Sequence, residues 1–175
     1  MKMTRRKFLR RTVAGALLIG AGIVVARHVG GYKLDGALAE KLRVLSPKEA
    51  EIFVAFCRRM LVADGPDAPP LDEPGAVLFV DGYLQRVSPE IQDDIKGLLQ
   101  LFEHGSGFFR LSTARFTRMS AAAQDAVLAD WETSRLALRR QGFQGLKTLA
   151  LFAYWRDART WPVLGYDGPT IGLRR

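Results

Sequence analysis

Cysteine and histidine are scarce in this 175-residue chain, which contains one cysteine, Cys57, and two histidines. A lone cysteine forms no disulfide within the chain and cannot provide a Cys-x-x-Cys-His haem attachment, an iron–sulfur cluster or a cysteine-based zinc site. No cluster of His, Cys and carboxylate residues has metal-site spacing, and no Gly-x-Ser-x-Gly sequence presents a nucleophile. We therefore predict that the chain binds no cofactor or metal, and that Cys57 is a small core residue.

Segments that alternate between apolar and polar residues are also few, which is evidence against strands. Apolar residues instead recur at helical spacing in several segments. The predicted helices begin at Ser46, Ala76, Ser88, Ser120 and Leu146 and end near Ala63, Val87, Gly105, Leu138 and Asp157. We expect an all-α domain of about five helices, with a break at Gln141–Gly145. Residues 161–169 are too rich in glycine and proline for a helix, so we expect an irregular tail packed on the domain.

Two of these helix starts carry a clear capping pattern. Ser46 precedes Pro47, and Glu49 stands three residues after the serine, as in a capping box. Ser88 also precedes a proline, and Ser120 precedes a run of alanines. Serine side chains at such positions accept hydrogen bonds from backbone N–H groups of the first turn.

Acidic residues are missing from residues 1–27, which contain seven lysines and arginines. The formal net charge of the whole chain is +8, which leaves +1 (8 minus 7) for residues 28–175. A nucleic-acid-binding domain needs a basic patch on its folded part. We therefore predict that the chain has no nucleic-acid partner, although its pI is about 10.1.

The basic N-terminus contains the sequence Thr-Arg-Arg-Lys-Phe-Leu-Arg at residues 4–10, followed by an apolar run from Val13 to Ala26. It resembles the twin-arginine export signal, Ser/Thr-Arg-Arg-x-Phe-Leu-Lys, which is an address read by a receptor. The residues that carry the resemblance are Arg5, Arg6, Phe8 and Leu9. It implies recognition by the twin-arginine translocase and export of the folded protein to the periplasm.

We expect residues 1–39 to form the export segment and residues 40–175 to form the helical domain. Ala37-Leu38-Ala39 has the small-x-small form of a cleavage site, and Ala26 lies closer to the apolar run. The run is shorter than the roughly 20 residues that span a bilayer. An uncleaved segment that tethers the protein to the inner membrane is the alternative.

Aromatic residues gather near the C-terminus, at Tyr154, Trp155, Trp161 and Tyr166. Such a cluster either packs in the core or forms a docking surface, because aromatic residues are enriched at interfaces. A second group, Phe102, Phe108 and Phe109, flanks glycines at the end of the third predicted helix.

The segments Leu146–Trp155, Trp161-Pro162 and Leu164–Pro169 resemble the gluconate 2-dehydrogenase subunit 3 family, the small subunits of flavin dehydrogenase complexes. The chain departs from the family pattern between Trp155 and Trp161, where a proline-containing turn is expected. The resemblance implies a non-catalytic subunit that helps a large FAD-containing subunit to mature and be exported. The large subunit oxidises a sugar, sugar acid or alcohol, and a cytochrome c subunit with haem c accepts the electrons.

The expected partner-docking residues lie in this C-terminal region. They are Tyr154, Trp155, Trp161, Pro162, Gly165, Tyr166, Gly168 and Pro169. Two alternatives remain open at this point. One is a membrane-anchored periplasmic structural or interaction protein, and the other is a stand-alone periplasmic enzyme that uses His104 or buried carboxylates.

Overall fold

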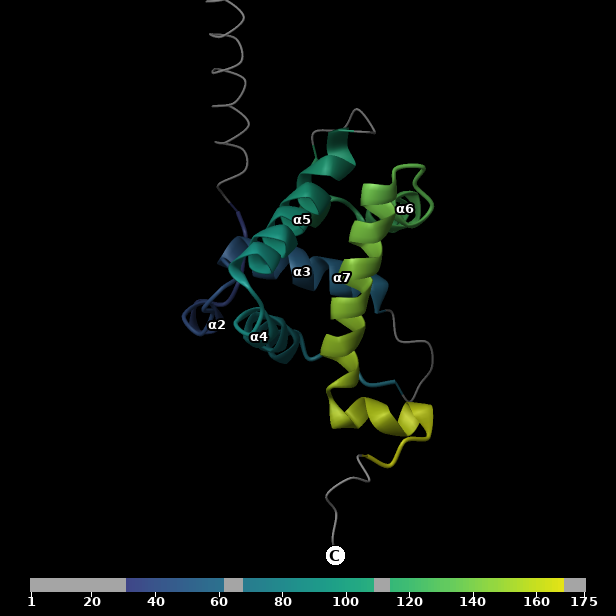
Figure 1. Cartoon of the computed structure of the whole chain (residues 1–175). Coiled ribbons are helices and arrows are strands. Elements are labelled where there is room, and N and C mark those ends of the chain that lie inside the picture. The colour runs from purple at the N-terminus through teal and green to yellow at the C-terminus, as the bar shows by residue number, and fades with distance from the viewer. Residues whose placement is uncertain (1–30, 62–67, 109–113, 169–175) are drawn as a thin grey trace, which may run out of the picture. The chain divides into compact units, whose positions relative to one another are not determined.

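The computed structural model describes residues 31–61, 68–108 and 114–168, apart from the side chains of residues 106–108 (Figure 1). The expected export residues Arg5, Arg6, Phe8 and Leu9 lie outside this range, as does Pro169. The chain divides into two units between Tyr32 and Lys33, and all the elements described below belong to the second unit.

The described residues form helices and turns and contain no strand, which confirms the all-α prediction. The α-helices are α2 (Gly36–Ala39), α3 (Pro47–Met60), α4 (Glu73–Leu84), α5 (Pro89–Phe108), α6 (Ala121–Glu132) and α7 (Ala137–Trp155). Two 3-10 helices are η1 (Phe116–Arg118) and η2 (Ala158–Leu164). The five predicted helices correspond to α3–α7. None of the helices in the described ranges is long and apolar enough to span a bilayer.

The capping box before α3 is present as predicted. The Ser46 side chain accepts a hydrogen bond from the Glu49 N–H, and the Glu49 carboxylate accepts one from the Ser46 N–H at 2.8 Å. Ser120 caps α6 through the N–H of Ala123. The start of α4 differs from the prediction, because Asp72 rather than a later residue provides the cap and the helix begins at Glu73.

The break between the last two helices lies at residues 133–136 and not at Gln141–Gly145, so that prediction was wrong. Thr133 donates its hydroxyl to the Ala129 carbonyl at 2.8 Å, and the Ser134 hydroxyl accepts from the Leu136 N–H at 3.3 Å. Side chains of this kind compete with helical backbone bonds and end α6 here.

Helix α7 continues through Gly142 and Gly145, although a helical glycine costs about 1 kcal/mol relative to alanine. A Cβ on Gly142 would lie 2.5 Å from a methyl carbon of Leu98 in α5 and 3.4 Å from the Trp131 ring in α6. Gly142 therefore permits a close approach between helices, and packing offsets its low helix propensity. Helix α5 also continues past its predicted end, because Gly105 does not adopt the positive φ of a helix-ending glycine.

The core is organised around Phe102 of α5. Its ring centroid lies 5.2 Å from that of Phe56 in α3, 4.5 Å from Phe116 in η1 and 5.0 Å from Trp131 in α6. Phe56 in turn lies 6.1 Å from Phe143 in α7. All five rings are almost completely buried, and the tilted and edge-to-face pairs are favourable aromatic geometries. The predicted burial of the single cysteine, next to Phe56, is confirmed.

Asp81 of α4 is a buried carboxylate that holds the turn before α3. It accepts hydrogen bonds from the backbone N–H groups of Arg43, Val44 and Leu45, at 3.0, 2.9 and 2.8 Å, and from the Gln85 side chain at 2.9 Å. Burial alone would raise the pKa of Asp81, but these hydrogen bonds to the charged form outweigh it and lower the pKa. Asp81 is therefore ionised and fully engaged in binding the backbone.

Residues that were expected to belong to the export segment pack on the helical domain. Leu34 and Leu38, together with Leu42 of the expected helical domain, pack against the cluster of the buried residues Ala50 and Val54 of α3 and Val77 of α4. The Lys33 N–H also donates to the Glu51 carboxylate. The compact helical unit starts at Lys33 and includes these contacts.

We predict that Asp81→Asn lowers the free energy of unfolding by about 2 kcal/mol at pH 7, because bonds to a charged group contribute about 1.5–3 kcal/mol. The folded-state pKa is lowered, so this stabilisation is complete above the unfolded value of about 3.9 and is lost as the pH falls through the folded value. Urea unfolding should show a smaller deficit at pH 3 than at pH 7. Asp93→Asn, at an exposed position on α5, is the control, and an equal deficit at both pH values would contradict the prediction.

Candidate docking site in the C-terminal tail

The chain turns sharply at the end of α7 and forms η2, the yellow end of the described chain in Figure 1. Asp157 caps η2 by accepting from the Arg159 N–H at 3.0 Å, and the buried Thr160 donates its hydroxyl to the Asp157 carbonyl at 2.7 Å. The expectation that residues 161–169 contain no helix was therefore wrong for Trp161–Leu164. The short 3-10 helix accommodates Pro162, and Gly165 closes it with φ 63°.

The predicted aromatic residues form two ring pairs that are joined by a hydrogen bond. The ring centroids of Tyr154 and Trp155 lie 5.0 Å apart, and those of Trp161 and Tyr166 lie 5.4 Å apart. The Trp161 indole N–H donates to the Trp155 carbonyl at 2.9 Å, which connects the pairs. The aromatic residues that sequence reasoning selected are thus brought together by the turn between α7 and η2.

Gly168 lies directly against the Trp161 ring. Its φ is 109°, and a Cβ would lie 3.1 Å from ring carbon Cζ3. Only glycine adopts such a φ readily. Gly165 and Gly168 therefore act as turn residues that fold the tail around Trp161.

Tyr154 lies largely inside the protein. It is 9% exposed, and its hydroxyl donates to the Pro69 carbonyl at 3.0 Å. Two residues later, Arg156 forms an ion pair with Asp72 at 3.0 Å. These contacts attach the end of α7 to the segment that precedes α4, so Tyr154 supports the tail and offers little surface to a partner.

The outward side of the tail is apolar. The exposed fractions are 43% for Val163, 60% for Leu164 and 44% for Tyr166, and Pro162 between them and Trp161 is also exposed. We call these four residues the tail surface. Val163 and Leu164 were missed as individual contacts at the sequence level, because the prediction relied on aromatic residues and glycines. Their position on a 3-10 helix could not be inferred from composition.

The charged groups on the α7 side of the tail surface are paired, and the exposed Asp167 follows Tyr166 on its other side. Asp157 and Arg159 form an ion pair at 2.6 Å, and the hydrogen bond from Arg159 is the main cause that lowers the pKa of Asp157. Arg156 is engaged with Asp72. The tail therefore presents apolar side chains beside two ion pairs and one exposed carboxylate, which suits another protein surface better than a polyanion.

His104 and the buried carboxylate Glu103, the residues of the enzyme alternative, lie elsewhere, near the end of α5. The Lys48 Nζ lies 3.1 Å from the His104 Nε2, and burial is the main cause that lowers the pKa of Lys48. Glu103 accepts from the Thr117 N–H at 3.1 Å and from its hydroxyl at 2.6 Å. The Glu103 hydrogen bonds connect α5 to η1, and the Lys48–His104 contact connects α5 to α3. Glu103 therefore has a structural role.

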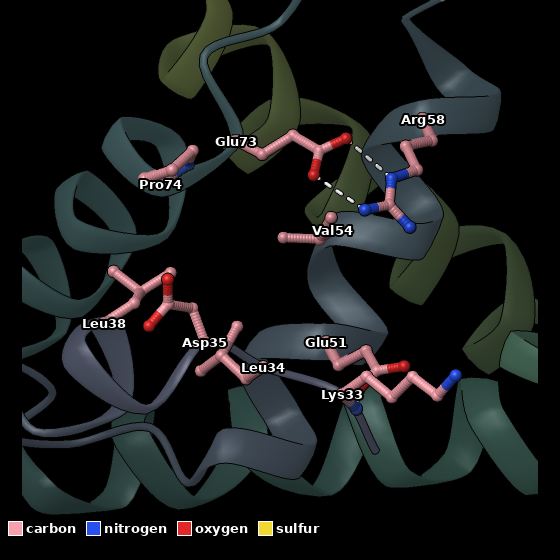
Figure 2. A pocket seen from close by; sticks show the side chains of 9 residues that line it. All are labelled: Lys33, Leu34, Asp35, Leu38, Glu51, Val54, Arg58, Glu73 and Pro74. Carbon is pink, nitrogen blue, oxygen red and sulfur yellow. Dashed lines mark hydrogen bonds and ion pairs between the residues drawn. The ribbon is translucent and has the colours of Figure 1, made fainter. Parts of the chain in front are cut away.

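A pocket of about 410 Å³ lies between the segment before α2, α3 and α4, and none of its lining residues belongs to the tail or to the His104 group (Figure 2). Its carboxylates already have partners. Glu73 forms two hydrogen bonds with Arg58, at 2.6 and 2.7 Å, Glu51 accepts from the Lys33 N–H, and Asp35 accepts from the Ala37 N–H. Within the described ranges, no group of His, Cys, Asp and Glu residues could hold a metal ion.

Comparisons with protein-family models, with curated proteins and with solved structures found no match for this chain. The tail surface is therefore the candidate site on the strength of its own geometry.

We predict that Gly165→Ala loosens the tail, because a residue with a Cβ is strained by about 1 kcal/mol at φ 63°. The Tyr166 amide, which donates to the Trp161 carbonyl at 3.1 Å, should exchange its hydrogen about fivefold faster by NMR. Gly165→Asn is the matched control, because asparagine tolerates the left-handed conformation. Equal exchange rates of the Tyr166 amide in the two variants would show that the φ angle at residue 165 does not determine the stability of the tail.

Proposed function

We propose that this chain is a non-catalytic subunit of a flavin-dependent dehydrogenase complex, and that it assists maturation and twin-arginine export of the catalytic subunit. The observation that carries the docking part is the tail surface, with three large side chains 43–60% exposed: Val163 and Leu164 at the end of the 3-10 helix, and Tyr166 in the turn after it. Contiguous apolar exposure of this kind usually marks a protein–protein contact.

The tail surface is preorganised for binding. The Trp161–Trp155 hydrogen bond, the buried Thr160 and the two positive-φ glycines hold the 3-10 helix and the turn after it, which display Val163, Leu164 and Tyr166. A partner therefore loses little free energy in ordering this surface, which is a major cost of association. Tyrosine and leucine side chains at its centre would fill pockets on the catalytic subunit, as interface anchors do.

The identity of the partner rests on the sequence resemblance at Leu146–Trp155 and Leu164–Pro169. In this proposal FAD is bound by the large subunit, which oxidises a sugar, sugar acid or alcohol, and haem c by a cytochrome c subunit. The structure supports the order of events that twin-arginine export needs, since a core of aromatic contacts and a buried free cysteine require no oxidation to form. The domain can fold and bind its partner before Arg5 and Arg6 engage the translocase.

We predict that Leu164→Asp weakens the affinity for the flavin subunit of the proposed complex by about 30-fold, the effect of removing an interface anchor. Leu138→Asp is the matched control, because Leu138 is similarly exposed, at 66% against 60%, but lies at the other end of α7. Binding by isothermal titration calorimetry should be weakened only in the Leu164 variant. Unchanged affinity after Leu164→Asp would show that the tail surface is not the docking site for the flavin subunit.

The export role is tested separately by Arg5→Lys/Arg6→Lys in cells that express both subunits. Flavin content of the periplasmic fraction should fall to background, while the complex still forms in the cytoplasm. If the flavin subunit reaches the periplasm in equal amounts, it does not depend on this chain for export.

A further inference from the structure

The start of α7 carries a second exposed apolar group, far from the tail surface. Leu136 and Leu138 are 52% and 66% exposed, and the exposed arginines Arg135 and Arg140 flank them in the sequence. We call these four residues the α7 corner. The 19 residues of α7 separate it from the tail by about 27 Å at 1.5 Å per residue.

The acidic residues nearest in the sequence are engaged by other cations. Asp130 forms an ion pair with the buried Arg139, and Glu132 forms one with Lys147 at 3.6 Å. From Thr133 to Arg156 the sequence contains no aspartate or glutamate. The positive charges of the α7 corner are therefore not compensated locally.

Arg140 is held at the corner by a hydrogen bond from its Nη1 to the Ser134 carbonyl at 2.6 Å. Within the described residues, neither Arg135 nor Arg140 forms an ion pair with a carboxylate. The N-terminus of α7 has no side-chain cap at Leu136, so the helix dipole adds positive potential at the same place. Along the sequence, two exposed leucines thus lie between two arginines that form no ion pair within the described residues.

We propose that the α7 corner binds the surface of an anionic membrane. Leu136 and Leu138 enter the boundary between headgroups and acyl chains, and Arg135 and Arg140 contact lipid phosphates, the combination that peripheral membrane proteins use. Two leucines provide far less area than the roughly 800 Å² per partner of a specific protein interface. The positive charge of the two arginines and the small area of the two leucines together favour a lipid surface over a protein surface.

This inference does not depend on the proposed function, because it rests on the opposite end of α7. If both proposals hold, the flavin subunit binds the tail surface while the α7 corner binds the membrane. The flavin subunit would then be held beside the membrane without a spanning helix from the described part of this chain.

The test uses the full chain with a spin label at Leu138→Cys and vesicles of phosphatidylcholine, with or without phosphatidylglycerol. Cys57 is buried, and burial is the main cause that raises the pKa of its thiol, so the label reacts with the introduced cysteine. On anionic vesicles the label should become accessible to oxygen and shielded from a water-soluble nickel complex. A label at Leu164→Cys, at the other end of α7, should stay water-exposed.

The basic leader also attracts anionic vesicles, so affinity is measured in a chain whose Arg5, Arg6, Arg10 and Arg11 are changed to glutamine. In that chain Arg135→Gln/Arg140→Gln should weaken vesicle binding by about 30-fold, if each arginine contributes as basic residues near anionic membranes generally do.

Three results would overturn the proposal. The label at residue 138 could stay water-exposed on vesicle-bound protein, or respond equally to neutral vesicles, or become shielded only when the flavin subunit binds. The last result would assign the α7 corner to a protein interface. Leu164→Asp separates the two proposals, since it should weaken flavin-subunit binding and leave vesicle binding unchanged.

Discussion

The packing of Phe102 is the interaction on which the rest of the structure depends. This one ring contacts aromatic side chains from α3, η1 and α6, and Phe56 extends the cluster to Phe143 in α7. Large-to-small changes in such a core typically cost 3–5 kcal/mol, roughly, because the cavity collapses only in part. Since the cluster fixes the position of α7, it also fixes both ends of that helix, where the tail surface and the α7 corner lie.

The buried polar groups serve this architecture. Asp81 binds three consecutive backbone N–H groups, and Glu103 binds Thr117 twice. A buried carboxylate with several hydrogen bonds is satisfied and stays engaged, in contrast to a catalytic acid or base that must exchange a proton. The same holds for the carboxylates around the pocket in Figure 2, each of which already has a hydrogen-bond donor. The hydrogen bonds of these carboxylates thus contribute to holding the fold together.

Helix α7 has a different character at each end. At its start, exposed leucines lie next to arginines without acidic partners in the described residues. Beyond its end, the exposed apolar residues of the tail surface follow the ion pairs Arg156–Asp72 and Asp157–Arg159. Uncompensated charge favours an anionic surface, whereas paired charge beside apolar side chains favours another protein. A single rigid helix can therefore connect two kinds of partner, which suits a subunit whose proposed task is to hold and escort another protein.

The sequence by itself determined what depends on neighbouring residues. The caps at Ser46 and Ser120, the helical spacing that predicts α3–α7, the burial of Cys57 and the turn roles of Gly165 and Gly168 all follow from local chemistry. Only the tertiary structure decided where α7 begins, because the packing of Gly142 against Leu98 outweighs a local propensity of about 1 kcal/mol. It also decided that Tyr154 turns inward while Leu164 faces solvent. Those outcomes depend on groups such as the Pro69 carbonyl, which lies 85 residues from Tyr154 and forms a contact that no local pattern encodes.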